Sequence, residues 1–302
     1  MQKNIAFILL LVTPFWSFAS EDKAIEEFTL NDQQILLAFE ILDTLESNHL
    51  IKKDYASIRH ESFEVFIDRL DPNKTIFTSE ELDSLLVHAD ENIDLEKDLE
   101  LAFKLFNFYV SRYQERYQRQ IEFLNTAQSE SFDTPRALLR DLSEIERLSS
   151  LDDLNALWVD LSTNDVIQLM LSGNTLEEAI TKTIKRMDNQ LNYFLQTRNE
   201  DVFNIFVNAI ASIYGPHTNY MSPKNSEDFD INMSLSLEGI GALLSSDGLY
   251  TSISSLVPGG PAEKTESLKP KDKIIGVGQD QFGEIIDVIG WRIDDVVDLI
   301  RG

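Results

Sequence analysis

The sequence predicts an α+β chain in two parts, a mostly helical N-terminal domain followed by a small strand-rich domain. Glycine separates the two parts, because Gly173 is the first of the 12 glycines and the other eleven begin at Gly215. Helix formers dominate the first part, and apolar residues such as Ile35 and Phe39 recur there at helical spacing. Apolar and polar residues alternate after Met233, which indicates strands.

The first 19 residues have the pattern of a secretory signal peptide. Lys3 precedes an apolar run over residues 5–15, and Ser17-Phe18-Ala19 is a small-x-small cleavage pattern. The apolar run is short for a bilayer span. We therefore expect an exported, periplasmic protein with no stable membrane span after residues 1–19 are removed.

The charge of the chain restricts its partners. The formal net charge is −26 and there is no cysteine. Such a chain repels phosphate backbones and anionic membrane surfaces, so nucleic acid is not an expected partner, whereas neutral or basic polypeptides are tolerated. The four histidines show no H-x-x-x-H pairing. No metal site and no cofactor are predicted.

Residues 20–214 are predicted to form the helical domain, and residues 215–232 a connecting segment. Thr78 and Glu81 have the spacing of a capping box at a helix start. The aromatic residues of 94–127 are expected to pack in the core, and Arg112, Arg116 and Arg119 to form solvated contacts with acidic neighbours. The predicted helices span residues 31–48, 58–70, 79–91, 94–127, 134–148, 151–160, 163–171, 175–197 and 199–214.

A short acidic segment between two of these helices partly matches a calcium-binding loop. Asp71, Asn73 and Thr75 occupy odd positions of such a loop, but Ile76 and Leu82 stand where calcium needs a glycine and a bidentate glutamate. The segment is therefore predicted to be a turn between helices.

The strand-rich domain, residues 233–302, begins with a glycine-bearing loop. Gly239 and Gly241 flank Ile240 between two apolar runs, and Asp247-Gly248 marks a hairpin. Two glycines around one aliphatic residue allow successive N–H groups to turn toward one point, which suits a free C-terminal carboxylate. The following strand could then pair with an extended peptide. The alternative is that the glycines only shape a turn.

Three further segments complete this domain. Pro258 to Lys264 is predicted to open a short helix with proline near its first turn, and Lys273 to Gly278 to form a buried strand that ends in a turn. The last segment, 291–300, is an amphipathic helix. Its apolar stripe consists of Ile293, Val296, Val297 and Ile300, and its acidic side of Asp294, Asp295 and Asp298.

The order of these pieces resembles a PDZ domain of the bacterial, circularly permuted kind. Four segments, NEDVF from residue 199, PHTNYMSPKNSEDF from 216, MSLSLEGIGALL from 233 and DVIGWRIDDVVDLI from 287, are similar to the tail-specific proteases, the carboxy-terminal processing peptidase family. The likeness is strong over 199–302 and weaker, in the same order, over 25–198.

The resemblance implies part of a serine endopeptidase of the Ser/Lys type. Members of the family bind apolar C-terminal tails of envelope proteins through the PDZ domain, and their helical domain encloses substrate and engages partners. The resemblance leaves open a periplasmic lipoprotein adaptor. By the same resemblance the peptide C-terminus would bind Leu237, Glu238, Gly239, Ile240, Gly241, Ala242 and Leu243, with Ile293, Val296, Val297 and Ile300 lining the groove.

The sequence departs from the family pattern at several points. The catalytic serine and lysine of the family follow the PDZ domain, and this chain ends at Gly302. No catalytic residue is therefore assigned, the chain alone is expected to be inactive, and its PDZ domain is expected to lack the last strand. Gly215 stands where the family favours aspartate, and Lys271 where PDZ turns favour glycine. Two alternatives remain, a non-enzymatic periplasmic peptide-binding scaffold and a helical adaptor with a remnant of a PDZ domain.

Overall fold

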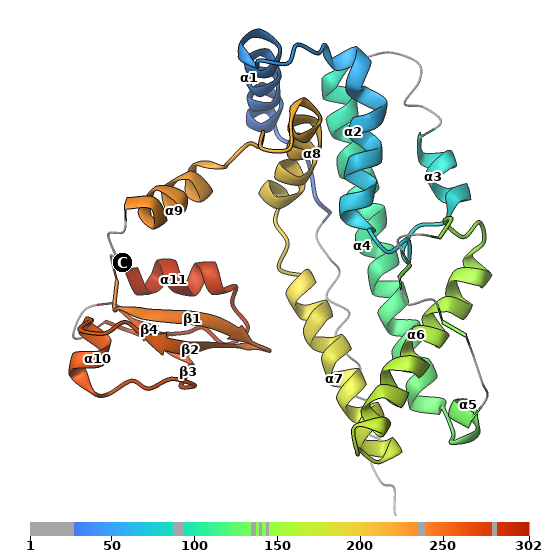
Figure 1. Cartoon of the computed structure of the whole chain (residues 1–302), viewed down its shortest axis with the longest axis vertical. Helices are drawn as coiled ribbons and strands as arrows, with labels where there is room; N and C mark the ends of the chain where they lie inside the picture. Colours follow the sequence, from blue (N-terminus) through green and yellow to red (C-terminus); the bar gives the residue numbers. More distant parts are fainter. Residues whose placement is uncertain are drawn as a thin grey trace, which may run out of the picture.

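The computed structural model describes residues 27–86, 94–133, 137–138, 141–142, 145–234, 239–279 and 283–301. It has two lobes, a helical one and a smaller mixed one, so the predicted α+β class is confirmed (Figure 1). The helical lobe contains α1 (Asp32–Asn48), α2 (Tyr55–Leu70), α3 (Ser79–Leu86), α4 (Leu95–Thr126), α5 (Glu130–Asp133), α6 (Leu151–Leu171), α7 (Leu176–Phe194) and α8 (Asn199–Tyr214). The predicted signal peptide lies outside the described residues.

The 32-residue helix α4 organises the helical lobe. Its first half packs with α1, α2 and α8 around one apolar core, in which Phe66, Leu99 and Phe206 are fully buried. Its second half packs against α6 and α7 around a second core that contains Leu124 and Val166. The aromatic residues of α4 join these cores, as predicted. Within the described part of the chain, no helix combines the length and hydropathy that crossing a bilayer requires.

Two helix predictions are confirmed in detail and one is wrong. The Thr78 capping box forms, since the Thr78 N–H donates to Glu81 Oε2 at 3.0 Å and the Glu81 N–H to Thr78 Oγ1 at 3.2 Å. Helix α8 has the predicted bounds. The predicted break after residue 160 does not occur, because α6 runs through it. The hydroxyls of Ser162 and Thr163 donate to carbonyls one turn earlier in the same helix, so neither interrupts it.

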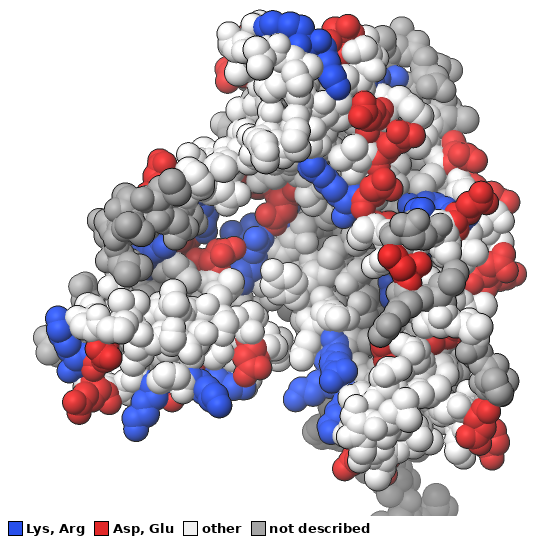
Figure 2. Space-filling model, viewed as in Figure 1, with Lys and Arg blue, Asp and Glu red and all other residues white. Residues whose placement is uncertain are grey.

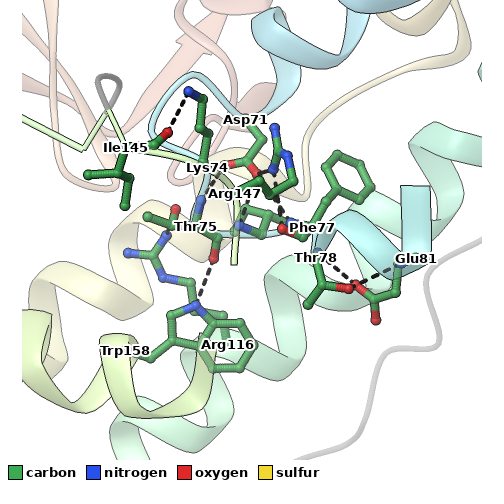
Figure 3. Close-up of polar contacts among 11 residues, drawn as sticks. Asp71, Lys74, Thr75, Phe77, Thr78, Glu81, Arg116, Ile145, Arg147 and Trp158 are labelled. Atoms are coloured by element: carbon green, nitrogen blue, oxygen red, sulfur yellow. Dashed lines mark hydrogen bonds and ion pairs between the residues drawn. The ribbon is translucent and has the colours of Figure 1, made fainter. Parts of the chain in front are cut away.

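The predicted helix over 134–148 is also wrong, because the residues described there are not helical. Long-range polar contacts hold this segment across the loop between α2 and α3. The Ile145 carbonyl accepts from Lys74 Nζ at 2.7 Å, and the Leu148 carbonyl from the Ser79 N–H at 2.9 Å. The Arg147 guanidinium reaches Asp71 in the same loop (Figure 3). These contacts outweigh local helix propensity.

The turn predicted at Asp71 is confirmed, and its carboxylate organises it. Asp71 is buried and accepts from the N–H groups of Thr75 at 2.7 Å and of Ile76 and Phe77 at 3.1 Å, besides its ion pair with Arg147 (Figure 3). The Trp158 indole N–H donates to the Thr75 carbonyl at 2.7 Å. The carboxylate therefore satisfies backbone donors that the turn leaves unpaired.

The prediction of solvated arginines on α4 is correct for one residue and wrong for another. Arg119 pairs with Glu115 one turn earlier on the exposed surface. Arg112 is instead buried and pairs with both Glu81 and Glu115. Arg116 donates to the Thr75 hydroxyl at 2.8 Å. Tertiary packing thus uses these charges to join α3, α4 and the Asp71 turn.

The connecting segment contains a helix that the sequence did not predict. Helix α9 (Pro223–Ser234) begins with proline, which is suited to the first turn of a helix. It leads from the helical lobe to the small lobe, with α8 on one side and β1 on the other (Figure 1).

The small lobe consists of short strands and two helices. A three-stranded antiparallel sheet has the order β1-β2-β3, and β4 and β5 form a separate antiparallel pair. The predicted hairpin joins β1 to β2 with Gly248 at φ +64°, a conformation that favours glycine. The elements are β1 (Ala242–Asp247), β2 (Tyr250–Leu256), α10 (Pro261–Thr265), β3 (Lys273–Ile274), β4 (Gly276–Gly278), β5 (Ile285–Asp287) and α11 (Ile293–Arg301).

The single buried strand predicted over 273–278 is wrong. The segment divides at Ile275 into β3, which pairs with β2, and β4, which pairs with β5. Ile275 is exposed, and its carbonyl accepts from the Val288 N–H at 3.2 Å. The chain therefore changes sheets at this residue, and a run of apolar letters does not reveal such a change.

Lys271 lies in the left-handed region with φ +77°, as its place in a turn that favours glycine suggested. We expect Lys271→Gly to stabilise the small lobe by about 0.5–1 kcal/mol, because the left-handed penalty of a side chain exceeds the added flexibility of glycine in the unfolded chain. Urea denaturation measures the change. The matched control is Lys269→Gly, at a residue without positive φ. Equal effects of the two substitutions would contradict the explanation.

Candidate functional site

The sequence-predicted site residues fall on two neighbouring elements of the small lobe. Gly239, Ile240 and Gly241 form the loop that leads into β1, and Ala242 and Leu243 begin that strand. Helix α11, with the predicted apolar stripe, lies alongside β1 (Figure 1). Leu237 and Glu238 lie outside the described residues.

Both glycines of the loop adopt backbone conformations that other residues rarely use. Gly239 has φ +135° and Gly241 has φ +74°. At Gly241 the lack of a side chain also permits close packing, since a Cβ there would lie 3.2 Å from both Gly260 Cα and Pro261 Cδ. The G-x-G spacing is therefore required by conformation at both positions and by space at the second.

Two hydrogen bonds fix the direction in which the loop amides point. The Ile240 carbonyl accepts from the Ala262 N–H, and the Gly241 carbonyl from the Val257 N–H, both at 2.8 Å. A trans peptide unit places its N–H opposite its C=O. The N–H groups of Gly241 and Ala242, which share peptide units with these carbonyls, therefore point away from Ala262 and Val257. Two adjacent amides that point away from these neighbours are a candidate site for an anion.

Strand β1 continues from this loop as an edge strand. Its one sheet neighbour is β2, so the backbone groups on its other side have no strand partner in the described sheet. Leu243 is 56% exposed, whereas Ala242 and Leu244 are partly buried. An extended peptide could add to such an edge, with main-chain hydrogen bonds for affinity and alternate side chains for specificity.

The apolar stripe of α11 provides a wall beside this edge. Val296 is fully buried in the lobe, while Ile293, Val297 and Ile300 are only partly buried. These three side chains therefore keep apolar surface that a ligand could cover. The strand edge, the outward amides and this apolar face together make an arrangement suited to an extended peptide with an apolar C-terminal residue.

The acidic side of α11 makes contacts that the sequence did not predict. Asp295 pairs with Arg198 and Asp298 with Lys224, and both cations belong to segments before the small lobe. Arg292, which precedes α11, donates from Nη1 to Asp201 Oδ2 at 2.7 Å. The helix that borders the candidate groove is thus tied to α8 and α9 by ion pairs. The signal in the sequence was an acidic helix face, Asp294, Asp295 and Asp298, on a helix whose only basic residue is Arg301 in its last turn.

The ion pairs alter the pKa values of their cations. The hydrogen bond with Asp298 is the main cause that raises the pKa of Lys224 above its usual value, with further contributions from the neighbouring acidic residues. Burial alone would lower the pKa of Arg292, but the hydrogen bond and charge of Asp201 outweigh it and raise the pKa. Both cations therefore remain charged at neutral pH.

In the described part of the chain, no group of three or more His, Cys, Asp or Glu residues could hold a metal ion.

Comparison with known proteins identifies both lobes. Residues 41–224 match the tail specific protease N-terminal domain, and residues 228–302 match the PDZ domain. The tail-specific protease of Haemophilus influenzae is 36% identical over 249 residues, which cover 80% of this chain and 34% of that protein. The carboxy-terminal processing protease CtpA of Bacillus subtilis is 30% identical over 150 residues, which cover 49% of this chain and 31% of that protein.

One solved structure also matches part of the chain. The PDZ domain of the carboxy-terminal protease from Vibrio cholerae, in complex with a peptide, is 56% identical, covers 22% of this chain and 66% of that chain, and superimposes with a TM-score of 0.21. This chain spans about a third of the length of the curated relatives it matches. The match to the N-terminal domain covers more than half of the sequence. The chain therefore belongs to the tail-specific protease family.

Proposed function

We propose that this chain is the substrate-recognition portion of a periplasmic serine endopeptidase that binds apolar C-terminal tails of proteins for proteolysis. The observation that carries the proposal is the loop at Gly239 to Gly241, which leads into the edge of β1 that has no sheet partner among the described residues. A terminal carboxylate is the peptide group that the adjacent amides of Gly241 and Ala242 would bind, through charge-assisted hydrogen bonds. The last side chain would contact the partly buried residues of α11.

Other parts of the proposal rest on the family resemblance and on the sequence. These are the Ser/Lys type of chemistry, the export by a cleavable signal peptide, and a periplasmic lipoprotein adaptor as a further partner. Because no catalytic residue is assigned in residues 1–302, we expect the chain alone to bind tails without cleaving them. Cleavage of a bound peptide by the purified chain would contradict that expectation.

The test compares one apolar peptide in two forms, with a free C-terminus and with an amidated one. We expect amidation to weaken binding at least about tenfold, because hydrogen bonds to a charged group are worth about 1.5–3 kcal/mol each. Fluorescence anisotropy with a label at the peptide N-terminus measures both affinities. Equal affinities would contradict the proposal, and a scrambled peptide with a free but polar C-terminus controls for the apolar preference.

A further inference from the structure

An open pocket of about 850 Å³, called the cavity below, lies between α11 and the loop that joins α7 to α8. It is on the acidic side of α11, and its walls include Gln196, Arg198, Gln279, Trp291, Asp295 and Leu299. Figure 2 shows acidic and basic side chains gathered between the two lobes. The volume of the cavity is within the range of ligand-binding sites, and such sites are frequent at boundaries between domains.

The cavity combines apolar and polar groups in a way that suits a polypeptide segment. Trp291 is 44% exposed and offers an aromatic surface, and Leu299 of α11 also lines the cavity. Gln196 donates from Nε2 to the Gly290 carbonyl at 2.8 Å, but its buried Oε1 has no hydrogen-bond partner among the described residues. A small rotation of this side chain would let a backbone N–H of a ligand satisfy that oxygen.

The path of a bound tail leads toward this cavity. If the terminal carboxylate lies at Gly241, at the start of β1, the preceding residues run antiparallel to β1 toward its end at Asp247. The hairpin that follows is bonded to the cavity wall, because the Gly290 N–H donates to the Leu249 carbonyl at 2.7 Å. Gly290 and Trp291 both line the cavity.

The length of β1 sets which residues of the tail reach the cavity. The strand has six residues, so a paired peptide passes its end after about six residues at about 3.3 Å each. The hairpin tip also lies against the helical lobe, since a Cβ on Gly248 would be 3.4 Å from Asn189 Nδ2 of α7. A chain that leaves the strand edge therefore emerges where the two lobes meet.

We infer that this cavity is a second subsite for the same polypeptide, which holds the segment about seven to ten residues before the C-terminus. It selects an apolar or aromatic side chain for contact with Trp291 and Leu299. Acidic peptide segments bind less well, because the net charge of −26 on this chain repels them. This inference rests on the proposed function, because it requires the tail to be bound at the Gly241 loop.

The test uses tryptophan fluorescence in a chain with Trp16→Phe, in which Trp158 and Trp291 are the remaining tryptophans. Trp158 is 1% exposed, so acrylamide quenches mainly Trp291. Two peptides share one apolar tail, a short one of about five residues and a long one of about twelve residues with phenylalanine about eight residues from the end. We expect the long peptide to bind at least about threefold more tightly and to protect Trp291 from quenching, because aromatic contacts add to the tail affinity.

Variants separate the subsite from the tail site. Trp291→Ala is expected to abolish the advantage of the long peptide and to leave the affinity of the short one unchanged, and Trp291→Phe to restore most of the advantage. The matched control is Leu171→Ala, at a 77% exposed apolar residue at the end of α6. It should change neither affinity.

The possible failures are distinguishable. Equal affinities of the two peptides, with Trp291 quenched equally in both complexes, would overturn the second subsite. If the short peptide still requires its free carboxylate, the proposed function stands in that case. If amidation of the short peptide has no effect, the proposed function fails, and the second subsite fails with it.

Discussion

Replacement of Asp71 by alanine is expected to destabilise the helical lobe by about 3–5 kcal/mol, the loss that follows when one partner of a buried ion pair is removed. The Asp71 side chain is 1% exposed and that of Arg147 is 11% exposed, so the substitution leaves a positive charge with little water around it. It also removes the acceptor for the N–H groups of Thr75, Ile76 and Phe77. Urea denaturation followed by circular dichroism measures the loss.

Two further substitutions serve as controls for Asp71→Ala. Asp71→Asn keeps one acceptor oxygen and should cost less than Asp71→Ala. Asp68→Ala removes an exposed carboxylate in the last turn of α2, the helix that ends directly before Asp71. It should change the free energy of unfolding by no more than about 0.5 kcal/mol. A loss below about 1 kcal/mol for Asp71→Ala would contradict the role given to this carboxylate.

Gly241→Ala is expected to weaken binding of an apolar tail peptide at least about tenfold, equivalent to about 1.4 kcal/mol. Alanine at this position would have to adopt a left-handed backbone conformation. Its Cβ would lie 3.2 Å from Gly260 Cα, so the loop must shift. The shift would move the N–H groups of Gly241 and Ala242 from their outward positions.

The control for this variant is Gly278→Ala in β4. Gly278 has no positive φ, and a Cβ there would have no neighbour closer than 3.5 Å. It should leave both peptide affinity and stability nearly unchanged. Binding of the tail by Gly241→Ala with wild-type affinity would show that the loop geometry is not needed.

Local chemistry explains why much of the fold was predictable. The Thr78 capping box, the proline that opens α10 and the hairpin at Gly248 are decided by a few adjacent residues. The capping box, the proline and the hairpin need no knowledge of distant contacts. The left-handed turn at Lys271 was instead expected from the resemblance to PDZ domains, whose turns favour glycine there, and its φ of +77° agrees.

The errors have the opposite cause. Residues 134–148 have good helix formers, but the pairing of Arg147 with Asp71 holds part of the segment in another conformation. The division of 273–278 into two strands depends on which partner each half meets. Both outcomes are decided by residues far away in the sequence, which periodicity does not report.

The candidate site was predictable in its loop and not in its surroundings. The glycine spacing and the apolar stripe of α11 are local patterns, and the structure places the two elements side by side. The cavity beyond α11 brings Gln196 near Trp291, residues that are far apart in the sequence and share no motif. Nothing short of the tertiary arrangement would have joined them.

The most direct test of the tail-binding site is a nuclear magnetic resonance titration of the ¹⁵N-labelled chain with an apolar peptide that has a free C-terminus. Hydrogen bonds from an amide to a carboxylate move the amide proton resonance downfield. We predict the largest downfield shifts at the N–H groups of Gly241 and Ala242, and their loss when the peptide is amidated. Binding with shifts confined to other residues, and none at this loop, would contradict the account.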